Sequence, residues 1–322
     1  MLSSSFSLPV AFCFAGQGSQ YFHMAAAFLK TYPVFRQWMD IGDRIVQNAQ
    51  GFSVLDIIYS DEHGISDPFD RLEHSHPALF ITQFAVAKLL QNQGVRPDLL
   101  LGASLGEFVA MSVSGMLPFE TALRAVACQP ALFEKSAPKG ALIGTLASAS
   151  VRSQSKILAE STEIAGKNGA SHCVLACRKA DLETVLGELR RLDISFQTLP
   201  VPFAFHSRWI EPAKQDFLNT VSGLHFETPF WPVWSSCLCR DVQQADGRQL
   251  WDIVRQPMQL QATLHAIEAR GGARYIDLSP TGTLAAVFRQ ELSEKSASEV
   301  VPLMSPYGGD LKRIEALFPA SP

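Results

Sequence analysis

A serine between two glycines stands at Gly102-Ala103-Ser104-Leu105-Gly106, after the apolar run 99–101 and before a helical pattern. A serine on a sharp turn from strand to helix projects from the edge of a sheet, and small flanking residues allow the turn. Backbone N–H groups at the start of the helix can stabilise an oxyanion there. The spacing also occurs in plain structural turns. The strand before it and the helix after it favour Ser104 as a nucleophile.

A serine nucleophile at its ordinary pKa needs a base, and His206 in Val-Pro-Phe-Ala-Phe-His-Ser is the best candidate. From spacing alone, a histidine after an apolar run is more often a packed residue. The remaining histidines and the six cysteines form no HExxH, HxxxH or paired zinc pattern. We therefore expect ordinary thiols, no metal and no other cofactor.

The composition is that of a soluble globular protein, with 322 residues, 47% hydrophobic and 18% charged. A net charge of -4 provides no basic field for nucleic acid or for an anionic membrane. The first residues lack the features of a signal peptide, and no apolar run approaches the roughly 18 residues of a membrane span. We expect a cytoplasmic protein with no nucleic-acid or membrane partner.

Strand and helix patterns alternate around these residues. The runs 9–15 and 99–101 predict strands, and 25–39 and 77–93 predict helices, the second beginning at Pro77. The stretch 118–135 predicts another helix, kinked at Pro130 because proline lacks a donor. Later strand-like runs at 230–235, 274–278 and 300–304 complete an α/β pattern with a mostly parallel sheet.

The pattern of predicted elements changes between residues 139 and 202. Here a strand, a helix, a strand, a helix and a strand follow one another within about 60 residues. This pattern predicts a small split βαβ subdomain inserted into a large one made of 1–138 and 203–322. Asn168 lies in an expected turn, 166–169, of the insert.

Four sequence motifs, in the same order along the chain, resemble those of the family of malonyl-CoA:acyl carrier protein transacylases and polyketide synthase acyltransferases. They are Phe-Ala-Gly-Gln-Gly-Ser-Gln at 14–20, Pro-Ala-Leu at 77–79 with the serine turn at 102–107, Phe-Ala-Phe-His-Ser at 203–207, and Ile-Asp-Leu-Ser-Pro-Thr-Gly at 276–282. The set covers almost the whole chain. The resemblance implies an α/β-hydrolase-like large subdomain and a ferredoxin-like small one.

The resemblance also implies roles in a ping-pong acyl transfer. Ser104 would take an acyl group from a thioester, with His206 as base and then as acid. Backbone N–H groups of Gln17 and Leu105 would form the oxyanion hole, and a main-chain carbonyl near Gln259 would orient the histidine. Asn168 resembles a family asparagine near the substrate, although a plain turn residue is equally compatible.

The chain departs from the family pattern at positions that are expected to contact the acyl group of the substrate. Members that use malonyl carry an arginine where this chain has Gln129, followed here by Pro130. Arginine donates two parallel charge-assisted hydrogen bonds to a carboxylate, whereas glutamine offers a neutral amide. Ala103 replaces a histidine common before the serine, and His76 replaces a frequent glutamine. Together with Gln129, Ala103 and His76 predict a changed acyl pocket that disfavours malonyl, although neutral drift could explain Ala103 and His76. Phe205, in the histidine segment, is expected to contact the substrate as well.

Loss of that arginine resembles the free-standing acyl hydrolases of trans-acyltransferase polyketide pathways, which release acyl groups from carrier proteins to water. The expected partner is an acyl carrier protein bearing a phosphopantetheine thioester, with acyl-CoA as a further candidate. The chain begins at its own methionine and ends soon after the family pattern, which favours a discrete protein acting in trans. The alternative is an acyltransferase that loads malonyl or another acyl group onto a carrier protein. A docking protein without activity and a general esterase fit the motifs less well.

Overall fold

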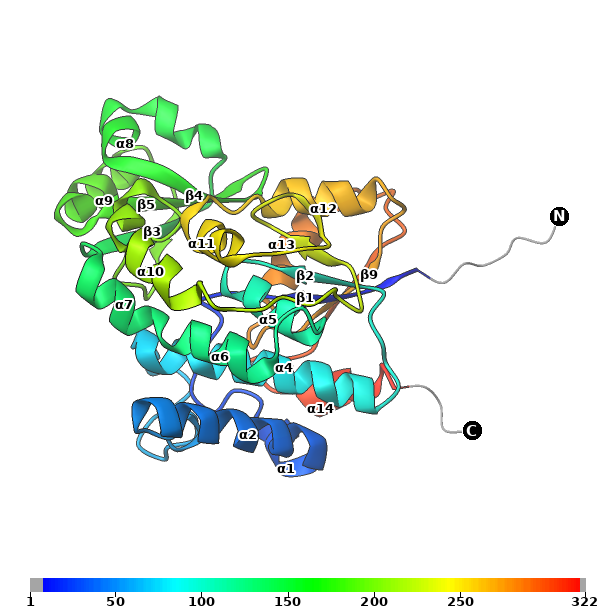
Figure 1. Ribbon diagram of the computed structural model, residues 1–322. Coiled ribbons are helices and arrows are strands. Elements are labelled where there is room, and N and C mark those ends of the chain that lie inside the picture. The colour runs from blue at the N-terminus through cyan, green and yellow to red at the C-terminus, as the bar shows by residue number, and fades with distance from the viewer. Residues whose placement is uncertain (1–7, 319–322) are drawn as a thin grey trace.

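The computed structural model describes residues 8–318, and within them the chain forms two sheets. The large sheet has the strand order β10-β9-β1-β2-β7-β8, and the small one has the order β4-β5-β3-β6. In the large sheet the pairs from β10 to β7 are parallel, and only the edge strand β8 runs antiparallel. The small sheet is antiparallel throughout. Figure 1 shows the small sheet with α8 and α9 gathered at one end of the molecule.

The strands of the large sheet are short, as expected for a buried parallel sheet. Their bounds are β1 Val10–Phe14, β2 Leu99–Gly102, β7 Val233–Ser235, β8 Arg240–Val242, β9 Arg274–Asp277 and β10 Glu299–Pro302. The small sheet consists of β3 Gly140–Thr145, β4 Thr162–Gly169, β5 His172–Arg178 and β6 Phe196–Thr198. Sequence patterns did not indicate β4 or β8, because both are polar stretches next to a turn.

Helices cover both faces of the large sheet (Figure 1). The α-helices before the insert are α1 Ala26–Thr31, α2 Pro33–Gln50, α3 Val54–Ile58, α4 Leu72–Asn92, α5 Leu105–Val113, α6 Phe119–Ala127 and α7 Gln129–Ser136. The insert carries α8 Lys156–Ser161 and α9 Leu182–Arg191, followed later by α10 Lys214–Val221, α11 Gly247–Arg255, α12 Leu260–Glu268, α13 Thr283–Glu291 and α14 Asp310–Glu315. Short 3-10 turns occupy Ala149–Gln154, Lys179–Asp181 and Arg208–Ala213.

The predicted helix bounds need three corrections. The expected helix over 25–39 is two helices, since Pro33 begins α2 after the extended Tyr32. The helix expected to begin at Pro77 begins at Leu72, with Pro77 in its second turn. The expected helix over 118–135 is divided at Cys128 into α6 and α7, and Pro130 lies at the start of α7, where a missing N–H costs least.

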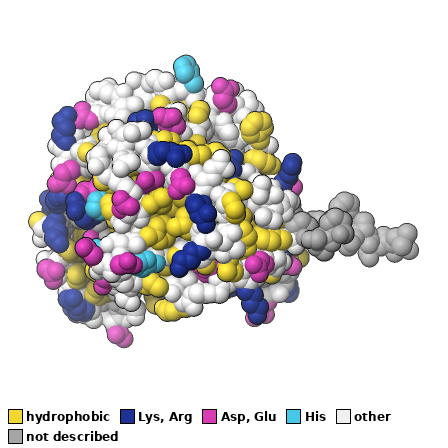
Figure 2. All heavy atoms as spheres, turned by 90° about the horizontal axis from the view of Figure 1, so that it is seen from below, with side chains coloured by type: hydrophobic (Ala, Val, Ile, Leu, Met, Phe, Trp, Pro, Cys, Tyr) yellow, Lys and Arg dark blue, Asp and Glu magenta, His cyan; other side chains and the backbone are white. Residues whose placement is uncertain are grey.

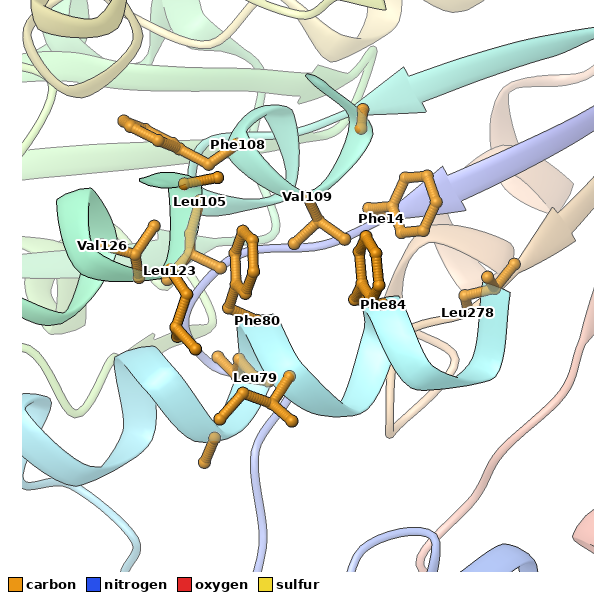
Figure 3. Packing of buried hydrophobic residues seen from close by; sticks show 14 of the residues in the cluster. Phe14, Leu79, Phe80, Phe84, Leu105, Phe108, Val109, Leu123, Val126 and Leu278 are labelled. Atoms are coloured by element: carbon orange, nitrogen blue, oxygen red, sulfur yellow. The ribbon is translucent and has the colours of Figure 1, made fainter. Parts of the chain in front are cut away.

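The core forms because β1 is apolar on both sides. Phe12 and Phe14 belong to the cluster that includes α4, α5 and α6, whereas Ala11 and Cys13 belong to the cluster with α12 and α13. Figure 3 shows Phe80 and Phe84 of α4 reaching toward the first helix turns of α5 and toward Phe14. These buried rings hold β1 and α5 in register, and both elements carry parts of the site.

The two chain crossings between the sheets lie side by side. Lys139 and Phe203 form an antiparallel bridge, and Gly140 N–H donates to the Pro202 carbonyl at 2.9 Å. A second tie joins β4 to the segment between α11 and α12, because Lys167 N–H donates to the Met258 carbonyl at 2.8 Å. The small sheet is therefore tied at two places to chain segments outside it.

The surface shown in Figure 2 mixes the two signs of charge, with lysines and arginines dispersed among carboxylates. This distribution accords with the small net charge of -4. In residues 8–318, no helix has both the length and the apolar character needed to cross a bilayer.

Candidate active site

Ser104 lies on a strained turn between β2 and α5. Its φ of 56° and ψ of -123° are values that residues with a side chain rarely adopt. Glycine is required on both sides of Ser104 because neighbouring backbone atoms leave no room for a Cβ. A Cβ at Gly102 would lie 2.4 Å from Glu107 Cα, and one at Gly106 would lie 2.0 Å from the Phe14 carbonyl oxygen. The GxSxG spacing thus reflects the packing of the turn against β1 and α5.

The structure brings Ser104 and His206 together from 102 residues apart, with Oγ and Nε2 at 2.9 Å. His206 Nδ1 donates to a main-chain carbonyl, that of Gln256, at 2.9 Å. This bond leaves Nε2 free to accept the serine proton. Burial lowers the pKa of His206 to about 4, and the Gln256 carbonyl opposes that shift only in part. The imidazole is therefore neutral at pH 7 and able to act as a base.

The expected main-chain carbonyl partner of His206 is present, but it belongs to Gln256 and not to Gln259. The Gln259 carbonyl accepts from Thr263 N–H at 3.0 Å and begins the hydrogen-bond ladder of α12. Gln256 follows the end of α11 and precedes Pro257, which favours an extended conformation, observed at φ -81° and ψ 151°. Its carbonyl therefore points away from a helix axis and is free to meet His206.

The predicted oxyanion donors lie beside the serine turn. A Cβ at Gly16 would lie 3.1 Å from Ser104 Cβ and 3.3 Å from Leu105 N, so the Gly16–Gln17 segment packs directly on the turn. Among residues 8–318, neither Gln17 N–H nor Leu105 N–H donates to another protein group. Gln83 fixes the strand end before them through both the N–H and the carbonyl of Ala15, at 2.8 and 3.0 Å. The two N–H groups are thus available to a developing oxyanion.

Glu107, which follows the second glycine of the serine turn, was assigned no role from the sequence. Its buried carboxyl group accepts from Ser235 Oγ at 2.5 Å, Ser236 Oγ at 2.8 Å and Cys237 N–H at 2.9 Å. Burial raises its pKa to about 7, against the lowering effect of these three donors. Glu107 therefore ties the helix after Ser104 to the end of β7. An acidic residue directly after the second glycine was the available signal.

The predicted acyl-pocket residues line one cavity of about 110 Å³ that also contains Ser104 and His206. They are Gln129, Ala103, His76, Phe205 and Asn168. Asn168 reaches the cavity from β4, so its expected position in a turn is wrong. The local strand is irregular, with register shifts between Ile164 and Gly166 and between Lys167 and Gly169. This irregularity explains why its glycines and asparagine resemble a turn in sequence.

No lysine, arginine, aspartate or glutamate is among the described residues that line this cavity. Burial lowers the pKa of His76 to about 4, so this ring is also uncharged at pH 7. Arg124, the nearest cationic candidate in sequence, pairs with Glu120 at 2.8 Å and its side chain is 48% exposed. The cavity therefore offers no positive charge to a carboxylate.

The site combines a serine, a neutral base and free N–H groups in a largely apolar cavity. Such an arrangement can form and break an acyl-serine, provided that the acyl group is uncharged. Within the part of the chain that the structure describes, His, Cys, Asp and Glu form no group of three or more that could hold a metal ion.

A model of the acyl transferase domain matches residues 11–318. The chain belongs to the acyl transferase domain family. The predicted resemblance and the α/β fold class are thereby confirmed. The family match includes the serine turn, the histidine segment and the insert that carries Asn168.

Two relatives of this acyl transferase family match nearly end to end. The chain is 36% identical over 299 residues to the polyketide biosynthesis acyltransferase homologue BaeD of Bacillus velezensis, covering 93% of this chain and 92% of the relative. It is 33% identical over 309 residues to the homologue PksD of Bacillus subtilis, covering 96% and 95%. The acyltransferase domain from the second module of the salinomycin polyketide synthase superposes with a TM-score of 0.83 at 26% identity, covering 97% of this chain and 72% of that one.

Proposed function

We propose that the protein is a serine hydrolase that releases short, uncharged acyl groups from acyl carrier protein thioesters in polyketide biosynthesis. One observation carries the acyl preference: Gln129 is 3% exposed in the wall of the Ser104 cavity, and its lining holds no cation. The polyketide role is supported by BaeD and PksD, whose names place them in polyketide biosynthesis. We expect the protein to act in the cytoplasm, with carrier proteins as partners.

The geometry supports two half-reactions. In the first, His206 Nε2 takes the Ser104 proton while Oγ attacks the thioester carbonyl carbon, and the N–H groups of Gln17 and Leu105 bind the oxyanion. Collapse of this intermediate expels the pantetheine thiolate, which takes the proton from His206. In the second, His206 takes a proton from water, and the hydroxide attacks the acyl-serine. Collapse then releases the carboxylic acid and returns the proton to Ser104 Oγ.

Malonyl is disfavoured because its carboxylate would lie in this wall without a charged partner. Hydrogen bonds to charged groups contribute about 1.5 to 3 kcal/mol, and an unpaired buried carboxylate costs more. Since about 1.4 kcal/mol corresponds to a factor of ten, the loss of such a bond disfavours malonyl by about ten- to a hundredfold.

Transfer to a second thiol is the alternative outcome, and the match to an acyl transferase domain over residues 11–318 favours it. Acyl-CoA or an acyl carrier protein would then supply the acyl group. Both outcomes begin with the same acyl-Ser104 and differ only in the acceptor. A docking role without catalysis is less consistent with the 2.9 Å contact between Ser104 and His206.

One experiment distinguishes these outcomes. The protein is incubated with acetyl- or butyryl-loaded carrier protein and, separately, with malonyl-CoA plus unloaded carrier protein, and the carrier mass is followed. We expect unloaded carrier and free acid from the first mixture and no malonyl-carrier from the second. Stable malonyl-carrier formation would overturn the proposal.

A further inference from the structure

Two cavities in the molecule share a wall. The Ser104 cavity has a volume of about 110 Å³. A larger groove of about 900 Å³ lies among the start of α4, helix α7 and the edge of the small sheet at β6. Leu199 and Val201 line both spaces. Leu199 and Val201 therefore lie at the boundary between the small cavity and the large groove.

The backbone of this wall is held independently of the two side chains. Leu199 N–H donates to the Leu142 carbonyl at 2.9 Å, and Val201 N–H donates to the Leu199 carbonyl at 2.8 Å, which closes a three-residue turn around Pro200. The proline ring restricts φ within that turn. Shortening the side chains should consequently open the wall without moving its backbone.

The small cavity limits the size of the acyl group. A cavity of about 150 Å³ in another protein holds one benzene, which has six carbons. A volume of about 110 Å³ therefore accommodates about four or five non-hydrogen atoms by the same measure. Acetyl to butyryl groups fit, and a longer chain must pass Leu199 and Val201.

The groove behind the wall suits the far end of an aliphatic chain. Its lining includes Leu72, Pro130 and Leu182. Its lining carries three cations and three carboxylates; Arg71 pairs with Glu73 and Lys139 with Glu134, while Lys179 and Asp70 form no ion pair among the described residues. These ion pairs reduce any preference for an anionic ligand, whereas the apolar surfaces can cover methylene groups.

We propose that Leu199 and Val201 form a partition that sets the upper length of the acyl chain on Ser104. With the partition shortened, carbons beyond about the fifth extend into the groove. This inference rests on the proposed acyl-Ser104 chemistry, because it concerns the same acyl group. It does not depend on whether water or a thiol is the final acceptor.

The test uses acyl-pantetheine thioesters from acetyl to decanoyl, and the release of free thiol reports acylation whatever the acceptor. We expect kcat/KM of the wild type to fall at least tenfold from butyryl to octanoyl. The double variant Leu199→Ala/Val201→Ala should reduce that fall at least tenfold. Leu182→Ala is the matched control, because Leu182 lines the groove but not the Ser104 cavity. It should leave the chain-length profile unchanged.

Two results would overturn the partition: a folded double variant with the wild-type profile, or a wild type that accepts octanoyl as readily as butyryl. Should the double variant not fold, Leu199→Ala alone should shift the profile in the same direction, because Leu199 is only partly buried. An unchanged profile in a folded Leu199→Ala would then count against the partition. Absence of thiol release from every thioester would instead overturn the proposed acyl-serine function.

Discussion

The serine turn and the acyl wall face the same cavity but differ in how their polar groups are satisfied. Around the turn, Ser104 contacts His206, His206 contacts Gln256, and Glu107 accepts three hydrogen bonds. Along the acyl wall, Gln129 Nε2 and His76 Nδ1 are buried, and neither has a partner among the described residues. Hydrogen bonds therefore fix the side chains around the turn, whereas the side chains of the acyl wall are uncharged and have fewer hydrogen bonds to fix them.

This difference separates two kinds of specificity. Forming an acyl-serine needs groups held within a few tenths of an ångström, and the hydrogen bonds around the turn supply that constraint. Excluding a carboxylate needs only the absence of a countercharge in a buried wall. Changes at the turn should therefore affect every substrate, and changes at the wall should affect the ratio between substrates.

Ser104→Ala should cause the largest loss, about 10⁴-fold or more in acylation with every substrate, because Ser104 carries the acyl group in the proposed reaction. Thiol release from butyryl-pantetheine measures the loss, and thermal unfolding checks that the variant folds. Activity within tenfold of the wild type would remove Ser104 from its assigned role.

Glu107→Ala should be the most destabilising of these changes. It leaves two serine hydroxyls and the Cys237 N–H without their acceptor in a buried place. Each unsatisfied buried group costs about 1 to 3 kcal/mol, so the total should reach about 3 kcal/mol. Denaturant unfolding measures the change. Glu107→Gln, which keeps one carbonyl acceptor, should lose less, and equal losses in the two variants would contradict the bonding described.

Gln129→Arg should raise the ratio of malonyl to acetyl use by about ten- to a hundredfold, since a guanidinium can pair with the malonyl carboxylate. The two kcat/KM values, measured by thiol release, give the ratio. Gln129→Met serves as the neutral control and should leave the ratio near that of the wild type. If the arginine variant also leaves it there, something other than the missing charge excludes malonyl.

Lowering the pH from 7 to 5.5 should change the acylation rate least, by less than about twofold. Because the pKa of His206 is lowered to about 4, its base form persists until the pH approaches that value. A histidine with the ordinary pKa of about 6.5 would lose about tenfold over this interval. The pH profile of kcat/KM measures the effect, and a tenfold decline at pH 5.5 would place the pKa of the base near its ordinary value.

Sequence reasoning succeeded where a side chain carries the signal. Ser104, His206 and Gln129 come from distant segments, yet motif and residue type sufficed to place them in one site. It was wrong at Gln259, because the group that orients His206 is a backbone carbonyl and any residue type supplies one. It misplaced Asn168 in a turn, because the irregular strand β4 contains glycines. The start of α4 was missed for a similar reason, since Pro77 resembles a first-turn proline but lies inside the helix.

The residue types along the chain were sufficient to predict the α/β class, a candidate nucleophile with a candidate base, and the lack of an arginine at position 129. Those properties depend on local chemistry and on apolar periodicity, which are written directly in the order of residues. The chain's folding in three dimensions was needed to show that the Gln256 carbonyl contacts His206, that Glu107 bonds to the end of β7, and that Leu199 and Val201 line two cavities. These features depend on where backbone groups point and on how side chains from separate elements fill space, and both arise only when the elements pack together.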